Sequence, residues 1–248
     1  QGMNFVAGTL LLFMEEEDAF WCLTSIIENL MPGYYSLAMM APQVDQRVFH
    51  RLIVQHFPTL ATHLESLCVD ASCVTSHWFL CLFVNALPLE TCLRVWDVFF
   101  LERDAAVLFR VGLALVDIFS KALMRTVDGV DAMCQLQATA PMMFDGSRLM
   151  TTACIGFQDI SRDILLHYRQ EVKEEVFGGV KARIDAMDSA HDLEAYHYEE
   201  ERFREMVDGE SDFNIRNYSR DLNANTSMRK SSGAPSLDAA GEVSGPGV

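Results

Sequence analysis

The sequence predicts an all-α fold, and three observations support that prediction. Apolar side chains recur at helical spacing along most of the chain before Gly209. No segment alternates apolar and polar residues as a half-buried strand does, and no Asn-Gly or Asp-Gly pair is flanked by such alternation. Half of the 248 residues are hydrophobic and 22% are charged, a composition that excludes a wholly disordered chain.

The first elements are expected to be short helices. Met3–Met14 carries no charge and is apolar all round, which is typical of a buried helix. A second helix, capped by Asp18, is expected to stop at Pro32-Gly33. Val44–Phe57 repeats apolar residues at helical spacing. Pro58 suits the first position of the next helix, because a residue there needs no partner for its N–H.

The middle of the chain carries the strongest helical patterns. Val74–Ala86 and Leu89–Leu101 predict two dense helices, which Leu87-Pro88 separates. Residues 105–124 predict an amphipathic helix, with Leu and Val on its buried face and Arg110 on its polar face.

Helical patterns continue to about Val207. Two shorter helices are expected near residues 129–139 and 146–155. A charged helical region begins at Asp159, and Gly178-Gly179 is expected to interrupt it because glycine is a poor helix former. No internal repeat of 30–45 residues is present, which argues against a solenoid.

Composition divides the chain into three parts. Residues 1–175 are expected to form the main helical domain, and residues 176–208 an acidic helical extension. The acidity is concentrated around that extension, since residues 171–210 carry 13 Asp or Glu and 5 Lys or Arg. Residues 209–248 hold few large apolar side chains, so a disordered tail is expected. Gln1 follows no initiator Met, and we expect the chain to be a fragment of a longer protein.

Charge and cysteine content exclude several classes of protein. The formal net charge of −16 argues against a nucleic-acid binder, which needs a basic face. No uncharged apolar segment reaches the roughly 20 residues that a membrane span needs. The seven cysteines are odd in number and scattered through apolar segments, so we expect buried free thiols in a reducing compartment.

One cluster of possible metal ligands has an alternative explanation. Cys68, Cys73, His77 and Cys81 carry zinc-ligating side chains, and the last two would share a helix face. Their spacing is not that of a usual zinc finger or ribbon, so buried thiols are favoured and no metal site is predicted. The chain also lacks the glycine-rich motifs that bind nucleotide phosphates.

Two stretches of sequence carry a resemblance to a known family. Gln1-Gly2-Met3-Asn4 is similar to the end of the Y-x-Q-G-M-N motif of TBC domains. Farther along the chain, three segments in the same order and spacing resemble the third TBC motif, an aromatic helix followed by L-P-x-E and R-x-W-D. They contain Trp78, Phe79 and Phe83; then Leu87, Pro88 and Glu90; then Arg94, Trp96 and Asp97. The resemblance covers about residues 1–175 and implies a multi-helix TBC-type domain truncated at its N-terminal side.

The resemblance also implies a function. TBC domains are GTPase-activating modules for Rab-type small GTPases in vesicle traffic, so the chain would be a regulator and not itself an enzyme. Gln1 would be a glutamine finger that orients the attacking water, while an arginine neutralises charge on the transferred phosphoryl group. The partner GTPase would carry GTP and Mg²⁺, so no cofactor of its own is expected. The implied location is cytoplasmic, with peripheral association with endomembranes as a further expectation.

Three departures from the family pattern limit this interpretation. The arginine motif I-x-x-D-x-x-R-T is missing, and the lone Arg-Thr pair, Arg125-Thr126, follows the R-x-W-D segment. The tyrosine two residues before the glutamine is not in the sequence either. Glu102-Arg103 replaces the usual Glu-Gly, which leaves that turn open. This chain alone is therefore expected to be inactive, and a non-catalytic TBC-like scaffold that binds a small GTPase or another protein is the alternative.

The remaining motif residues are expected to support the site. Gly2, Met3 and Asn4 would shape the finger loop, with Asn4 bonding to neighbouring turns. Arg94 and Asp97 are spaced to form an intrahelical ion pair, and the resemblance implies a structural role beneath the active surface. The aromatic residues of the third motif are expected in the core: Trp78, Phe79, Phe83 and Trp96.

Overall fold

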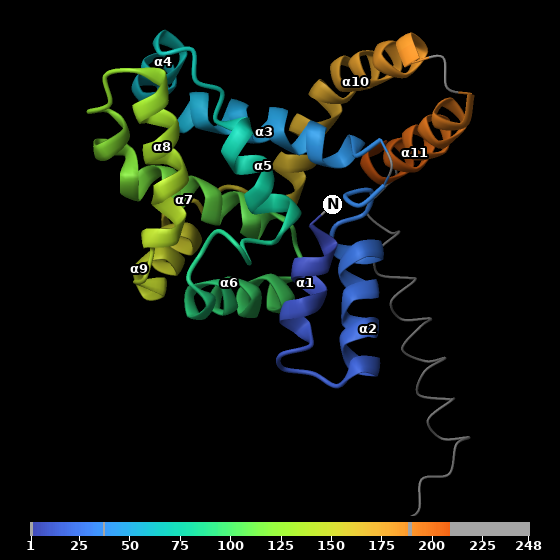
Figure 1. The fold of residues 1–248 in the computed structure, drawn as a ribbon, viewed down its shortest axis with the longest axis horizontal. Helices are drawn as coiled ribbons and strands as arrows, with labels where there is room; N and C mark the ends of the chain where they lie inside the picture. The colour runs from blue at the N-terminus through green and yellow to red at the C-terminus, as the bar shows by residue number, and fades with distance from the viewer. Residues whose placement is uncertain (1, 37, 188–189, 209–248) are drawn as a thin grey trace, which may run out of the picture. The chain divides into compact units, whose positions relative to one another are not determined.

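The computed structural model describes residues 2–36, 38–187 and 190–208. Within these ranges the chain forms eleven α-helices and no strand, which confirms the all-α prediction (Figure 1). The helices are α1 (Met3–Leu10), α2 (Glu16–Ser25), α3 (Met40–His56), α4 (Pro58–Ser66), α5 (Ser72–Leu80), α6 (Leu89–Glu102), α7 (Ala106–Leu123), α8 (Gly129–Thr139), α9 (Gly146–Thr151), α10 (Arg162–Met187) and α11 (Ala190–Asp208). Single π-helical turns follow α2 (Ile26–Leu30) and α9 (Thr152–Gly156), and a 3-10 turn (Ala140–Met142) follows α8.

Helix α7 is the centre of the core. Every residue from Ala106 to Val116 is buried, so the helix is surrounded on all sides over its first three turns. Arg110, which was expected on the polar face, is buried too and forms an ion pair with Glu102. That prediction was wrong because α6 packs beside the start of α7 and supplies a carboxylate from its last turn.

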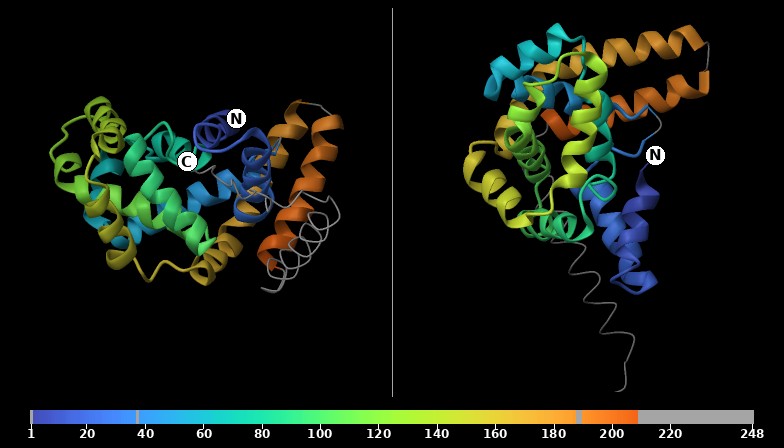
Figure 2. Two further views of the ribbon diagram at one scale, coloured as in Figure 1. Left: turned by 90° about the horizontal axis from the view of Figure 1, so that it is seen from below. Right: turned by 60° about the vertical axis from the view of Figure 1, so that its left-hand side comes forward.

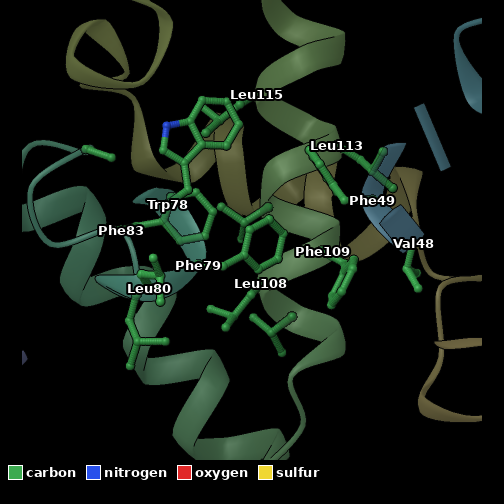
Figure 3. Packing of buried hydrophobic residues seen from close by; sticks show 14 of the residues in the cluster. Val48, Phe49, Trp78, Phe79, Leu80, Phe83, Leu108, Phe109, Leu113 and Leu115 are labelled. Atoms are coloured by element: carbon green, nitrogen blue, oxygen red, sulfur yellow. The ribbon is translucent and has the colours of Figure 1, made fainter. Parts of the chain in front are cut away.

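Aromatic rings from α3, α5 and α7 meet in the core (Figure 3). The ring of Phe79 lies 5.2 Å from that of Phe49 and 4.9 Å from that of Phe109. Gly112 allows this approach, because a Cβ at that position would lie 2.8 Å from the Phe49 ring. The close contact of α3 with α7 therefore depends on a residue without a side chain.

Helices α1 and α2 form a hairpin whose outer side is apolar and exposed. Met3–Met14 was expected to be one buried helix, but α1 ends at Leu10 and only one side of it is buried. The apolar side chains exposed on the hairpin are Met3, Phe5, Leu11, Leu12, Phe13, Met14, Phe20 and Trp21. The cap expected from Asp18 was also wrong, since α2 begins at Glu16 and Asp18 lies within its first turn.

The C-terminal helices pack on α3 and on each other (Figure 2). Helix α10 is 26 residues long and continues through Gly178-Gly179, so the expected interruption was wrong. A Cβ at either glycine would meet nothing within 4 Å, so neither residue marks a break in packing. The boundary expected at residue 175 falls inside this helix, and the tail expected at residues 209–248 lies outside the described residues.

Buried polar groups join α10 to α3 and to the loop after α2. The Arg169 guanidinium donates from Nε and Nη2 to the two carboxylate oxygens of Asp45 at 2.6 and 2.7 Å. The Tyr34 hydroxyl donates to the same carboxylate. Burial lowers the pKa of Arg169, but the Asp45 carboxylate outweighs that effect and raises it overall. Burial raises the pKa of Tyr34, and the Asp45 charge raises it further. Because breaking a buried pair strands a charge, this cluster fixes α10 on α3.

Several helix ends were predicted from local sequence. Pro58 occupies the first turn of α4, as expected. Helix α8 has the expected bounds, and the Asp128 carboxylate caps it by accepting from the Asp131 amide at 2.8 Å. Helix α9 is capped in the same way by Asp145. These boundaries depend on neighbouring residues alone, which is why the sequence located them.

Candidate functional site

The described part of the candidate site begins at Gly2, since Gln1 lies outside the described residues. Gly2 is buried at the start of α1, with φ +88°. A Cβ there would lie 2.9 Å from the Leu80 carbonyl oxygen and 3.3 Å from the Cys81 Sγ. Both the left-handed backbone and the close approach favour glycine. The residue directly after Gln1 is therefore packed against the end of α5.

Met3 and Asn4 lie differently from Gly2. Both side chains are exposed on the first turn of α1. Among the described residues, the Asn4 side chain makes no hydrogen bond to a neighbouring turn, in contrast to the expectation. Both side chains therefore face solvent, two and three positions after Gln1 in the sequence.

The aromatic residues of the third motif flank the turn after α5: Trp78 and Phe79 lie in α5, Phe83 in the turn and Trp96 in α6. Val74–Ala86 was expected to be one helix, but α5 ends at Leu80 because Leu82 and Phe83 adopt left-handed backbone, with φ +48° and +64°. Each such residue costs about 1–2 kcal/mol relative to right-handed backbone. The Phe83 amide donates to the Trp78 carbonyl at 2.8 Å, and the Trp96 indole Nε1 donates to the Leu82 carbonyl at 2.9 Å. These bonds offset the cost and hold the turn.

The four aromatic residues expected in the core are buried. Trp78, Phe79, Phe83 and Trp96 are each at most 4% exposed. Figure 3 shows the first three packed together with Leu80 beside α7. Pro88 lies at the start of α6 with extended backbone and ends the turn. The segment that carries the third motif therefore forms the surface against which Gly2 packs.

Arg94 and Asp97 do not form the expected ion pair. Both side chains are exposed on α6, and the described residues contain no salt bridge between them. The structural role beneath the active surface that the resemblance implied stays a prediction. The expectation of an ion pair failed because spacing at i, i+3 permits a pair, while two exposed side chains gain little by forming one.

The structure defines the conformation of the turn at Glu102-Arg103, which the sequence did not predict. Arg103 ends α6 in left-handed backbone, with φ +54°. Glycine adopts this conformation most readily, and the family's usual Glu-Gly suits it. The substitution of arginine therefore preserves the turn, and Glu102 forms its ion pair with Arg110 from the same place.

The cysteines do not form a metal site in the described part of the chain. No group of three His, Cys, Asp or Glu there is placed to hold a metal ion. Cys68, Cys73 and Cys134 are exposed, so the expectation that the thiols are buried was wrong for them. Cys81 and Cys92 are buried, and burial raises the pKa of the Cys92 thiol to about 12. Such a thiol stays protonated and is a poor nucleophile.

Sequence reasoning missed one contact at the site. The Tyr35 hydroxyl donates to the Leu80 carbonyl at 3.0 Å, the same oxygen that Gly2 approaches. The contact joins residues 45 positions apart, and no local pattern predicts it. The sequence places two tyrosines after Pro32-Gly33 but does not indicate their partners.

The comparison with known families decides what this arrangement belongs to. The sequence profile of the Rab-GTPase-TBC domain matches residues 1–124, which is half of the chain. The chain belongs to the Rab-GTPase-TBC domain family. The profile match contains both stretches that carried the resemblance, from Gly2 through Asp97.

Individual relatives agree with this assignment. The human protein named Small G protein signaling modulator 3 is 38% identical over 154 residues, which are 62% of this TBC chain and 20% of that protein. The bovine TBC1 domain family member 2A is 38% identical over 172 residues, which are 68% of this chain and 18% of that protein. The chain therefore spans about a fifth of the length of these curated relatives.

A solved structure has the same fold. The crystal structure of the Chlamydomonas flagellar RabGAP TBC domain superposes with a TM-score of 0.56 and 34% sequence identity. The superposition covers 64% of this chain and 52% of that one. As for membranes, the described helices include none that is long and apolar enough to span a bilayer.

Proposed function

We propose that this TBC chain accelerates GTP hydrolysis by a Rab-type small GTPase, with Gln1 as the residue that orients the attacking water. One observation carries the proposal: Gly2 is buried in left-handed backbone against the Leu80 carbonyl. This contact fixes the chain immediately after Gln1, which matches the glutamine of the family's Y-x-Q-G-M-N motif. A residue that must place a water molecule needs such a fixed attachment.

The chemistry suits a glutamine. Phosphoryl transfer requires little covalent work from the protein, and catalysis comes from positioning and from stabilisation of charge. An amide offers an acceptor for a proton of the water and a donor for a phosphate oxygen. The partner GTPase brings GTP and Mg²⁺, so this chain contributes no cofactor. We propose that it acts in the cytoplasm, peripherally on the endomembranes where its GTPase lies.

An arginine finger completes the mechanism from outside these 248 residues. The sequence contains no I-x-x-D-x-x-R-T motif, and such an arginine contributes about 10³–10⁵ in rate. The chain by itself is therefore proposed to be nearly inactive. The same absence favours the second candidate, a scaffold that holds a small GTPase without accelerating hydrolysis.

A variant of Gln1 separates the two candidates. In the full-length protein, Gln1→Ala is expected to slow single-turnover GTP hydrolysis by about 10²–10³, because the glutamine acts mainly in the transition state. Affinity for the GTPase loaded with a non-hydrolysable GTP analogue should stay within about threefold, since ground-state contacts are retained. A folded Gln1→Ala protein that hydrolyses at the wild-type rate would establish the scaffold instead.

A further inference from the structure

We infer that Tyr35 is a positioning residue for the finger loop, acting through the Leu80 carbonyl on Gly2. The inference rests on the proposed function, since it names a residue that orients Gln1. Tyr35 is not part of the motifs that carried the family resemblance at the finger or at α5–α6. Its assignment comes from the contacts around one carbonyl oxygen.

The Leu80 carbonyl lies at a junction of three segments. It belongs to the last residue of α5, where the chain turns away and no helical amide follows to bond it. The Tyr35 hydroxyl donates to it at 3.0 Å. A Cβ at Gly2 would lie 2.9 Å from the same oxygen, so Gly2 packs directly on it. Figure 1 shows the start of α1 beside this end of α5.

The Leu80 carbonyl is fixed from its own chain as well. The turn that follows contains the left-handed residues Leu82 and Phe83. The Trp96 indole donates to the Leu82 carbonyl, and the Phe83 amide donates to the Trp78 carbonyl. The bond from Trp96 of α6 therefore limits motion of the turn that follows Leu80, and the bond from Tyr35 limits motion of the Leu80 carbonyl itself. The two tethers together define the surface that Gly2 meets.

Tyr35 is itself anchored. Its neighbour Tyr34 is buried and donates to the Asp45 carboxylate, which Arg169 of α10 also binds. Burial raises the pKa of the Tyr35 phenol well above its ordinary value, so the hydroxyl remains a donor across the physiological pH range. The Tyr35 hydroxyl, which donates to the Leu80 carbonyl, is thus held in place through Tyr34 by α3 and α10.

Removing the hydroxyl should loosen the loop without removing any contact to the GTPase. With phenylalanine at position 35, the Leu80 carbonyl loses its protein donor and can shift. Gly2 then packs against a displaced carbonyl, and we expect the preceding residue, Gln1, to be displaced with it. Reaction rates depend steeply on such orientation, so the effect is expected in the rate constant.

The test uses Tyr35→Phe in the full-length protein. We expect kcat for the GTP hydrolysis that the TBC protein stimulates to fall about 3- to 10-fold, while KM for the GTPase stays unchanged. Tyr168→Phe is the matched control, because it deletes a tyrosine hydrogen bond of 2.6 Å to Gln55 between α10 and α3. That control should keep the wild-type rate at a comparable melting temperature. An equal loss of rate in both variants would overturn the inference.

A double variant shows whether Tyr35 acts through Gln1. In a Gln1→Ala background, Tyr35→Phe should cause no further loss of rate, because the residue that it orients is gone. An additional loss of the same size would overturn the inference. Full activity of Tyr35→Phe, in a protein that Gln1→Ala slows, overturns this inference alone. Full activity of Gln1→Ala overturns the proposed function as well.

Discussion

Turns at both ends of α6 adopt left-handed backbone at residues that are not glycine. Leu82 and Phe83 precede the helix, and Arg103 ends it. The first two are buried and bonded into the tryptophan motif, so tertiary contacts stabilise them. Arg103 is exposed at a position where the family usually has glycine. Its turn therefore retains a backbone cost that a single substitution removes.

Replacing Arg103 measures that cost. Arg103→Gly is expected to be about 1 kcal/mol more stable than Arg103→Ala, because glycine adopts the left-handed region without steric conflict. Both variants lose the arginine side chain, so their difference reports the backbone alone. Thermal or urea unfolding of the two proteins gives the measurement. Equal stabilities would mean that the turn relaxes when the side chain is removed.

At the scale of helices, two glycines have opposite roles. Gly112 lies in α7 where a Cβ would be 2.8 Å from the Phe49 ring, while a Cβ at Gly178 in α10 would meet nothing within 4 Å. The sequence shows a glycine in a helical pattern in both cases. Packing alone decides which of them the fold requires.

Alanine at each position tests this difference. Gly112→Ala is expected to destabilise the protein by about 1–3 kcal/mol, because the methyl group overpacks the contact between α3 and α7. Gly178→Ala is expected to stabilise α10 by about 0.5–1 kcal/mol through helix propensity. Denaturant midpoints of the two variants, compared with wild type, should move in opposite directions. A shift in the same direction would contradict the described packing.

Local sequence signals predicted where most helices lie. They did not predict helix ends or buried residues that depend on contacts with other helices. The bounds of α8 were expected from its helical pattern, and the start of α4 from Pro58, the first residue of that helix. The end of α5 was not expected, because Leu82 and Phe83 carry no turn signal and depend on Trp96, a residue from the next helix. Arg110 was misplaced for the same reason, since its partner Glu102 is supplied by another element.

The candidate site likewise contains one feature that the sequence predicted and one that it did not. The need for glycine at position 2 was predictable from the motif, and the structure gives its cause in the Leu80 carbonyl. The Tyr35 contact was not predictable, because it joins a loop after α2 to the end of α5. A single sequence records residue types along the chain, while this contact depends on the packing of several helices.

For the molecule as a whole, the α1–α2 hairpin presents the main exposed apolar surface among the described residues. Its side chains include Leu12 at 68% exposure and Phe20 at 59%. Contiguous apolar surface of this kind is unusual for a protein that remains monomeric in water. The 248-residue chain expressed alone is therefore expected to be poorly soluble.

Binding of a hydrophobic dye tests this expectation. The chain should bind 8-anilinonaphthalene sulfonate in its native state, and a triple variant with Leu12, Phe13 and Phe20 changed to Gln should bind less. Leu101→Gln is the control, because it removes an 81% exposed leucine from α6 and leaves the hairpin intact. A cooperative melt without dye binding by the wild-type chain would contradict the described surface.

The three tryptophans differ sharply in their surroundings, and this gives the turn after α5 its own optical signal. Trp21 is 55% exposed on the α1–α2 hairpin, whereas Trp78 and Trp96 are 2% and 4% exposed on either side of that turn. In a Trp21→Phe protein, all remaining indole fluorescence arises from the two residues that frame the surface behind Gly2. The Trp96 indole donates to the Leu82 carbonyl, so we expect its emission to change if this bond is altered. A change in that emission when a GTPase binds would therefore report, in solution and in real time, a movement of the turn after α5 that supports Gly2.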